Sequence, residues 1–190
     1  AEATEQLRTG LAMQIDDAIL LETDGEEWPP RATASAIADA IQQTDVEFDL
    51  LLFGNESADM ENYQVGTRVA YELGLPCVTG IKTLDIEDGT AIAKHEISGG
   101  EEVYEVNLPA VITVKEGINE PRYASMRAKM QARNQEIERR DPEHDTGTGS
   151  FEKIRLETPP ADDSDAEVLG EGTEAVPEIV DVLEHGVEVL

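Results

Sequence analysis

Two hydrophobic periodicities alternate along the first 84 residues of the chain. Leu7, Leu11 and Ile15 recur at helical spacing and predict a helix over residues 2–13. Similar patterns predict helices over 32–43 and 63–73, and buried strands over 18–21, 48–53 and 78–84. Strands that alternate with helices of this length are typical of parallel βαβ units, so an α/β fold with a parallel sheet is expected.

The pattern changes after residue 84. Apolar and polar residues alternate over 90–97 and again over 102–107, with Gly99-Gly100 between the two runs. This arrangement predicts a β-hairpin. The remaining pattern predicts a buried strand over 108–114, a loop over 119–123 that contains Pro121, and a helix over 125–139.

The C-terminal part differs in composition from the α/β domain expected over residues 1–140. Residues 141–175 are rich in Pro, Gly, Asp and Glu, which predicts an extended acidic linker. An amphipathic helix is predicted over 176–190, because apolar residues recur there at helical spacing. These residues are Val176, Ile179, Val180, Leu183 and Val187. The apolar face has two possible docking surfaces, the chain's own domain or a partner chain.

The charge balance limits the possible partners. Of 190 residues, 42 are acidic and 14 are basic, which gives a net charge of −28. Such a surface repels nucleic acid and anionic membranes, so neither is an expected partner. There are only five lysines against nine arginines. A lysine-poor acidic surface suits a cytosol of molar salt, where a Debye length of about 3 Å screens self-repulsion. A halophilic source is therefore predicted, with an ordinary acidic protein as the alternative.

Cysteine content and hydropathy indicate a cytoplasmic protein. Cys77 is the only cysteine, so no intrachain disulfide can form, and its place before an apolar run indicates a small core residue. No apolar run approaches the 18 residues of a membrane span, and no signal peptide is visible. The chain begins at Ala1, inside a predicted helix. Either this helix opens the domain or an N-terminal piece is missing.

Candidate catalytic groups are few. His95, His144 and His185 have no metal-ligand spacing with Cys77 or with one another. The chain contains no Gly-x-Ser-x-Gly elbow and no Walker A loop. The many carboxylates are typical of a solvated surface. The residues therefore favour a binding module over a hydrolase or a transferase.

Segment 54–66 is the strongest candidate site. It follows the apolar run 50–53 with a glycine, and short polar side chains lead from it into the next predicted helix. Such an order directs free backbone N–H groups and the positive end of a helix dipole at one point, where a phosphate is favoured. Open α/β sheets bind ligands at the carboxyl ends of their strands. A plain connection between strand and helix is the alternative.

Several segments together resemble one known family, the beta subunits of electron transfer flavoproteins. These segments are 7–13, 54–66, 95–100, 108–114 and 119–123. The stretch from 108 to 123, with the basic helix after it, is the most specific part. The resemblance covers about residues 3–140. It implies an adenine-nucleotide-hydrolase-like (Rossmann-like) domain that here lacks its first strands.

The resemblance also implies a heterodimer. An alpha subunit carries most of an FAD, and the beta subunit closes over the isoalloxazine ring. The beta subunit also holds an AMP in simple electron carriers, whereas a second FAD takes that place in electron-bifurcating relatives. The motif match assigns the nucleotide to Gly54, Asn55, Glu56, Ser57, Ala58, Asp59, Met60, Glu61, Asn62, Tyr63, Gln64 and Val65.

The nucleotide loop combines features of both branches of the family. Asp59 and Gln64 keep the family's residues, whereas Tyr63 and Val65 depart from the AMP-type loop. The run Gln64-Val65-Gly66 is more similar to the archaeal and bifurcating branch. The choice between AMP and a second FAD therefore stays open.

Further positions carry over from the family. Glu96 matches the acidic residue that faces the flavin edge, although His95 stands where the family usually has Arg. Residues 125–130 match a recognition loop that docks on acyl-CoA dehydrogenases. Met126 is the corresponding apolar anchor, with Arg127 and Met130 beside it. A core role for Met126 is the alternative.

The implied function is electron carriage, in which the cofactor supplies the chemistry and the protein orients it. Electrons would pass from flavoprotein dehydrogenases, such as the acyl-CoA dehydrogenases of fatty acid oxidation, to a membrane-bound electron transfer flavoprotein–quinone oxidoreductase. Two alternatives stay open. One is a bifurcating subunit with a second FAD, and the other is a free-standing adenine-nucleotide-binding module.

Overall fold

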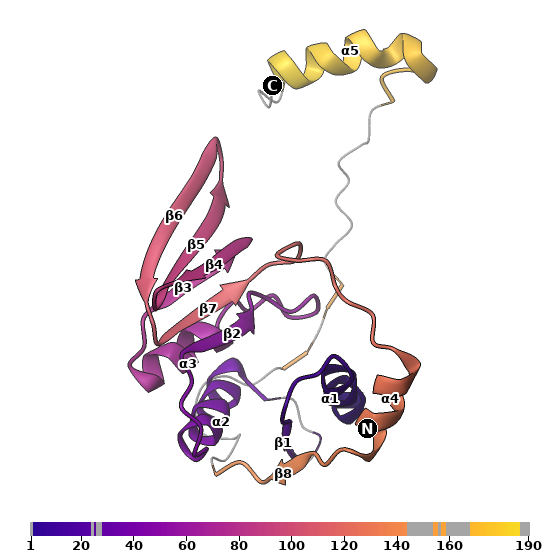
Figure 1. Ribbon diagram of the computed structural model, residues 1–190. Coiled ribbons are helices and arrows are strands. Elements are labelled where there is room, and N and C mark those ends of the chain that lie inside the picture. The colour runs from indigo at the N-terminus through magenta and orange to yellow at the C-terminus, as the bar shows by residue number, and fades with distance from the viewer. Residues whose placement is uncertain are drawn as a thin grey trace. The chain divides into compact units, whose positions relative to one another are not determined.

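The computed structural model describes residues 2–23, 25, 28–143, 154–155, 157–158 and 168–186. The chain divides into two units, Ala1–Phe151 and Glu152–Leu190. The elements of the first unit, drawn in Figure 1, are α1 (Glu2–Ala12), β1 (Ile19–Leu21), α2 (Pro30–Gln42), β2 (Leu50–Gly54), α3 (Val65–Leu73), β3 (Cys77–Ile81), β4 (Thr83–Glu87), β5 (Thr90–Ile97), β6 (Gly100–Asn107), β7 (Ala110–Val114), α4 (Met126–Asn134) and β8 (Glu138–Arg140). The mixture of parallel strands and helices confirms the expected α/β class.

A three-stranded parallel sheet forms the centre of the first unit. Its strand order is β2-β7-β3, and β7 pairs with both neighbours. The first four residues of β7, from Ala110 to Thr113, are buried. A parallel strand covered on both faces reads as an unbroken apolar run, which is why the sequence predicted this strand so directly.

Helices α2 and α3 pack on each other through small side chains. Ala34 and Ala38 of α2 meet Val69 of α3, and Phe53 of β2 lies against this cluster. Gly66 allows α3 to approach the sheet closely, because a Cβ atom there would lie 2.8 Å from Cγ2 of Thr113. The two predicted helices are thus confirmed, with ends shifted by up to two residues.

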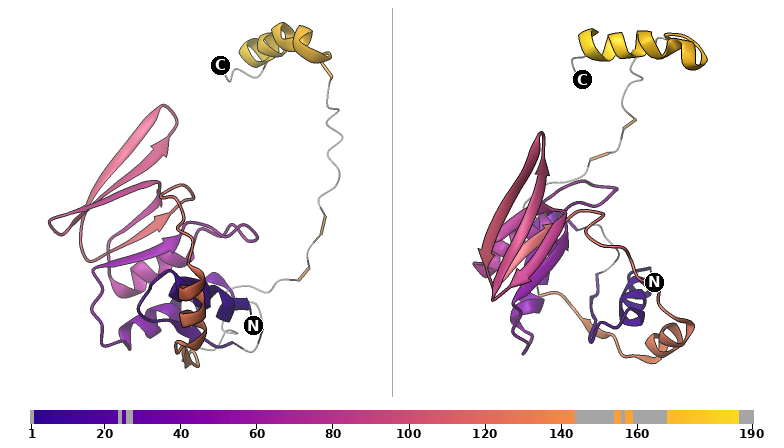
Figure 2. Two further views of the ribbon diagram at one scale, coloured as in Figure 1. Left: turned by 45° about the vertical axis from the view of Figure 1, so that its right-hand side comes forward. Right: turned by 45° about the horizontal axis from the view of Figure 1, so that its top comes forward.

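A three-stranded antiparallel sheet extends from the first. Strand β5 pairs with β6 up to the register Ile97 to Gly100, so the predicted hairpin is confirmed. The hairpin rises beyond the parallel sheet in both views of Figure 2. Ala91 and Ala93 of β5 share a buried cluster with Ile81 and Ile112 of the parallel sheet. This cluster makes one core of the two sheets.

The strand predicted over 78–84 is wrong in its last part. Strand β3 ends at Ile81, and residues 83–87 form β4, which pairs with β5 in the other sheet. The register with β7 shifts between Val78 and Ile81, where Gly80 takes a φ of +73°. Lys82 N–H then donates to the carbonyl of Lys94 at 3.0 Å. A continuous apolar pattern cannot show that its two halves pair with different strands.

Helices α1 and α4 lie side by side in Figure 1, although more than 110 residues separate them in the chain. Leu11 and Ala12 of α1 share a buried cluster with Ala132 of α4. Arg8 Nη1 donates to the Ala132 carbonyl at 2.6 Å and also to the carbonyl of Gln135. Arg8 therefore ties α1 to backbone carbonyls at the C-terminal end of α4.

The helix predicted over 125–139 is also too long. It ends at Asn134, and residues 138–140 form β8, which runs parallel to β1. Ile137, which lies beyond the end of α4, has its side chain buried in the cluster with α1. Pairing with β1 satisfies the backbone N–H and C=O groups of β8. The residues near β8 in the sequence do not indicate this pairing, because β1 lies far away along the chain.

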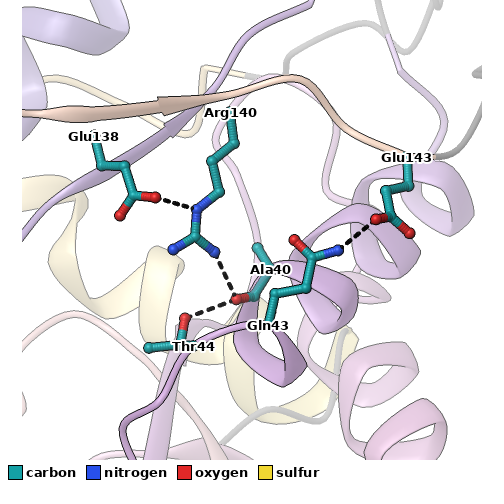
Figure 3. Close-up of polar contacts among 6 residues, drawn as sticks. All are labelled: Ala40, Gln43, Thr44, Glu138, Arg140 and Glu143. Carbon is teal, nitrogen blue, oxygen red and sulfur yellow. Dashed lines mark hydrogen bonds and ion pairs between the residues drawn. The ribbon is translucent and has the colours of Figure 1, made fainter.

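Strand β8 is tied to the end of α2 (Figure 3). Arg140 Nη1 donates to the carbonyl of Ala40 at 3.1 Å, and Arg140 Nε donates to Glu138 Oε1 at 2.6 Å. Thr44 Oγ1 donates to the same Ala40 carbonyl at 2.8 Å. The Arg140 hydrogen bond lowers the pKa of Glu138. These contacts place the last strand of the domain beside its second helix.

Two strands predicted to be buried are less buried than expected. Leu52 of β2 is 55% exposed, since β2 is an edge strand of its sheet. The three residues of β1 are half-buried, and Ala18 just before them is buried. The apolar runs indicated strands correctly, but only the number of covering elements sets their burial.

The second unit contains helical turns over residues 172–186: η1 (Gly172–Ala175), α5 (Val176–Asp181) and η2 (Val182–Gly186). They confirm the predicted helix up to Gly186, while Val187 and most of the linker 141–175 lie outside the described residues. The predicted boundaries at 141 and 176 stay predictions. Within the part of the chain that the structure describes, no helix has the length and hydropathy that a membrane span requires.

Candidate functional site

A pocket of ≈ 460 Å³ lies at the carboxyl end of β2. Ten of the twelve loop residues predicted from the sequence line it: Gly54, Asn55, Glu56, Ser57, Asp59, Met60, Asn62, Tyr63, Gln64 and Val65. Ala58 and Glu61 belong to the same loop but are not part of the lining. The predicted segment therefore lines an open pocket, as expected where a parallel strand ends and a helix begins.

The start of the loop is anchored to the central strand. Asn55 N–H donates to the carbonyl of Val114 at 3.0 Å. Thr113 Oγ1 donates to Asn55 Oδ1 at 2.7 Å and accepts from Gly80 N–H at 3.1 Å. Thr113 is the one buried polar side chain recorded for the core of the described residues. Its hydroxyl therefore links all three strands of the parallel sheet at the entrance to the loop.

The middle of the loop is shaped by two residues in the left-handed region. Glu61 has a φ of +46° and Tyr63 a φ of +55°. Glu61 N–H donates to the carbonyl of Ser57 at 3.0 Å, which closes a turn before them. Positive φ is costly for residues other than Gly, Asn or Asp, and such strain is concentrated at ligand sites.

The loop ends at the N-terminus of α3. Gln64 occupies the capping position, but its side chain makes no capping hydrogen bond. Instead, Gln64 Oε1 accepts from Arg68 Nε at 3.1 Å and from Arg68 Nη2 at 2.8 Å. The first turn of α3 consequently keeps uncapped N–H groups at the positive end of the helix, beside an arginine. An acceptor group of a ligand can satisfy them.

Two acidic side chains, Glu56 and Asp59, also line the pocket. Glu56 accepts a hydrogen bond from Asn55 Nδ2. The charge of Glu56, with a smaller contribution from Glu61, raises the pKa of the Tyr63 hydroxyl. Tyr63 therefore stays protonated and available as a hydrogen-bond donor. A phosphate is favoured only near α3, and the acidic side suits donors such as sugar hydroxyls or an amino group.

Four lining residues come from positions that the sequence did not single out: Trp28, Pro30, Thr33 and Phe53. Trp28 and Pro30 lie where the loop after β1 enters α2. The alternation of strands and helices could have indicated these residues, because loops that follow parallel strands lie at the same edge of a sheet. Trp28 is also the only tryptophan of the chain.

Glu96 is not part of this pocket. It lies near the end of β5, where Lys82 Nζ forms an ion pair with Glu96 Oε2 at 2.8 Å. The hydrogen bond and charge of Lys82, helped by Lys115, lower the pKa of Glu96. Nδ1 of the neighbouring His95 lies 3.8 Å from Oε2 of Glu102. Glu96 therefore remains ionised and sits apart from the predicted nucleotide loop.

The predicted docking residues Met126, Arg127 and Met130 lie on α4 and are not part of this pocket. Met126 is 74% exposed and Met130 is 64% exposed. A core role for Met126 therefore does not hold in the described structure. Ser125 caps the helix, since its hydroxyl accepts from Ala128 N–H at 3.2 Å.

Basic side chains gather beside these methionines. A second pocket of ≈ 430 Å³ between α1 and α4 is lined by Arg8, Lys129 and Arg133 together with Glu5. Arg127 is exposed on the same helix. In a chain of net charge −28, this concentration of cations favours an acidic partner surface.

Neither thiol nor metal chemistry is indicated at these sites. Cys77 begins β3 and is half-buried rather than fully in the core, and burial raises the pKa of its thiol. A raised pKa keeps the sulfur protonated and a poor nucleophile. Among the described residues, no group of three or more His, Cys, Asp or Glu side chains is placed to hold a metal ion.

A family model described as the electron transfer flavoprotein domain matches residues 1–145. The chain belongs to the electron transfer flavoprotein family. It is 31% identical over its whole length to an electron transfer flavoprotein subunit beta of Bacillus subtilis, of which it covers 76%. It is 41% identical over 72% of its length to the subunit beta of Syntrophomonas wolfei, of which it covers 53%.

A third relative belongs to a larger assembly. Over 72% of its length the chain is 36% identical to the caffeyl-CoA reductase-Etf complex subunit CarD of Acetobacterium woodii, of which it covers 52%. The chain thus spans about half the length of this protein and of the Syntrophomonas one. The matches confirm the resemblance to electron transfer flavoprotein beta subunits, a family of electron-transfer proteins rather than enzymes.

Proposed function

We propose that this chain is the beta-subunit part of an electron carrier. With an alpha subunit it would bind FAD and pass electrons from flavoprotein dehydrogenases, such as acyl-CoA dehydrogenases, to an electron transfer flavoprotein–quinone oxidoreductase. The observation that carries the proposal is the family match over residues 1–145. FAD supplies the redox chemistry when bound, so the tasks left to this chain are binding, orientation and docking.

The pocket after β2 supports an adenine nucleotide as its occupant. It offers uncapped N–H groups at the start of α3 and acidic acceptors at Glu56 and Asp59. The indole Nε1 of Trp28 is buried and has no hydrogen-bond partner among the described residues. The pocket thus offers donors and acceptors beside an aromatic residue whose own donor is unpaired, which is the pattern of a small-molecule site.

The α4 surface supports the docking of redox partners. Met126 and Met130 give an exposed, flexible apolar anchor, and Arg127 adds positive charge. Salt would screen the charges more than the apolar contact, so Met126 is expected to carry most of the affinity at molar salt.

The nucleotide decides between a simple carrier and a bifurcating one. The relative in the caffeyl-CoA reductase-Etf complex and the run Gln64-Val65-Gly66 give the bifurcating alternative specific support. Mass spectrometry of the small molecules released from the denatured complex separates the two. One FAD with AMP would support the simple carrier, two FAD without AMP would support bifurcation, and the absence of any nucleotide would refute the pocket assignment.

Co-expression with a matching alpha subunit tests the proposal as a whole. The two chains should purify together in high salt and show the visible absorption of a flavin. A colourless chain that does not associate would contradict the carrier assignment. A stable homodimer that binds AMP or ATP without flavoprotein partners would instead support a free-standing nucleotide-binding module.

A further inference from the structure

Trp28 stands out among the residues that line the pocket. It is the only tryptophan in the chain and lies in the loop before α2, whereas most of the lining comes from the loop after β2. Its Nε1 atom is buried and has no hydrogen-bond partner among the described residues. Buried indole N–H groups are normally paired, because an unsatisfied donor costs free energy.

We infer that Trp28 recognises the base of the bound nucleotide. The edge of the indole faces the adenine, and a turn of the ring brings Nε1–H, which is buried in this structure, to a ring nitrogen of the base, which accepts the hydrogen bond. The inference rests on the proposed function, since it requires an adenine nucleotide in the pocket. AMP and FAD share the adenosine group, so either would present the same base to Trp28.

The distribution of charge in the pocket assigns the base to the side of Trp28. The groups that favour phosphate, the uncapped N–H groups of α3 and Arg68, lie at Gln64. Trp28 and Pro30 carry no charge and come from the other loop. An uncharged base therefore finds a neutral part of the pocket there, where an indole N–H donor adds affinity without requiring charge.

Calorimetry on the full chain tests the inference, with circular dichroism to verify folding. Trp28→Phe keeps an aromatic surface and removes the donor, while Trp28→Leu removes both. AMP affinity should fall about fivefold in the first variant, as expected for one neutral hydrogen bond, and about tenfold or more in the second. Tyr71→Phe is the matched control, because Tyr71 is 88% exposed and lies outside the pocket lining.

Two further ligands identify what Trp28 contacts. Ribose 5-phosphate, which lacks the base, should bind all four proteins equally. AMP should also change the Trp28 fluorescence of the wild-type chain, whereas ribose 5-phosphate should not. FAD in place of AMP tells which source of adenosine the pocket takes, since the preferred one will bind the wild-type chain more tightly, while Trp28→Leu should weaken both by a similar factor.

The outcomes separate this inference from the proposed function. If AMP or FAD binds and the Trp28 variants match the wild type, the role of Trp28 is wrong and the nucleotide site stands. Equal losses for AMP and ribose 5-phosphate would also overturn base recognition. If the folded chain binds no adenine nucleotide at all, both the inference and the nucleotide assignment fail.

Discussion

The loop after β2 and the surface of α4 differ in the kind of ligand that each can bind. The loop is built into the sheet through Thr113 and, with acidic and aromatic side chains, lines an open pocket. The α4 surface exposes Met126 and Met130 with cations beside them, and its own side chains remain open to solvent. The two sites therefore differ in the sign of their charge and in that the loop is tied by hydrogen bonds to the central sheet.

This difference shows what each region needs from the fold. A small ligand requires groups held in fixed positions, so its site lies where a parallel strand ends and left-handed residues shape the turn. A protein partner needs accessible apolar surface and complementary charge, which one capped helix can present. Variants should accordingly damage one function and leave the other.

The largest effect is expected where α3 packs on the sheet. A Cβ atom at Gly66 would lie 2.8 Å from Thr113 Cγ2 and 3.0 Å from Phe53 Cβ. Gly66→Val should therefore lower the free energy of unfolding by about 3 kcal/mol through overpacking, and should weaken nucleotide binding. Urea unfolding and calorimetry measure both. In Gly100→Val, the control, a Cβ atom meets nothing within 4 Å, so an equal loss there would remove the packing explanation.

The next effect concerns the hydroxyl that connects the loop to the sheet. Thr113→Val keeps the shape of the side chain but leaves Gly80 N–H without its acceptor and Asn55 without its donor. We expect a loss of about 2 kcal/mol in the free energy of unfolding, typical of buried groups left unpaired. Nucleotide affinity should fall with it, while docking through α4 should be preserved. Unchanged urea unfolding would show that Thr113 does not organise the loop.

A smaller effect, confined to docking, is expected on α4. Met126→Ala should change the free energy of unfolding by less than about 0.5 kcal/mol, because the side chain is exposed. If the side chain anchors a partner, kcat/KM for reduction by an acyl-CoA dehydrogenase should fall about tenfold. Stopped-flow kinetics and the flavin content of the complex are the measurements. Tyr123→Ala, an exposed residue outside α4, is the control, and loss of flavin in Met126→Ala would indicate a structural role instead.

The smallest effect lies outside both regions, at the Lys82–Glu96 ion pair. The pair lowers the pKa of Glu96, so its stabilisation is present above the ordinary glutamate pKa and is lost as the pH falls through the lowered one. In Lys82→Met, the pKa of Glu96 measured by NMR should rise toward the ordinary value. Both side chains are partly exposed, so molar salt should nearly remove the difference. An unshifted pKa at low salt would show that the pair is not formed in solution.

Much of the candidate site could be predicted from the sequence, because the pattern that indicates it involves only neighbouring residues. A glycine after an apolar run, followed by polar residues and a helix, depends only on neighbours in the chain, and ten of the predicted residues line the cavity. Trp28 was not predicted, because its approach to the loop after β2 depends on packing between α2 and α3. The roles of Met126 and Glu96, like the halophilic source suggested by composition, stay predictions.

The sequence by itself determined the α/β class, the β5–β6 hairpin and the position of the nucleotide loop, because periodicity and turn residues act over a few neighbours. Only the tertiary structure decided that residues 83–87 leave the parallel sheet and that 138–140 form a strand beside β1. The backbone of residues 83–87 pairs with the next strand along the chain, whereas residues 138–140 pair with a strand near the start of the domain. An apolar pattern shows that a residue is to be covered, but it does not show which element covers it or which strand pairs with it.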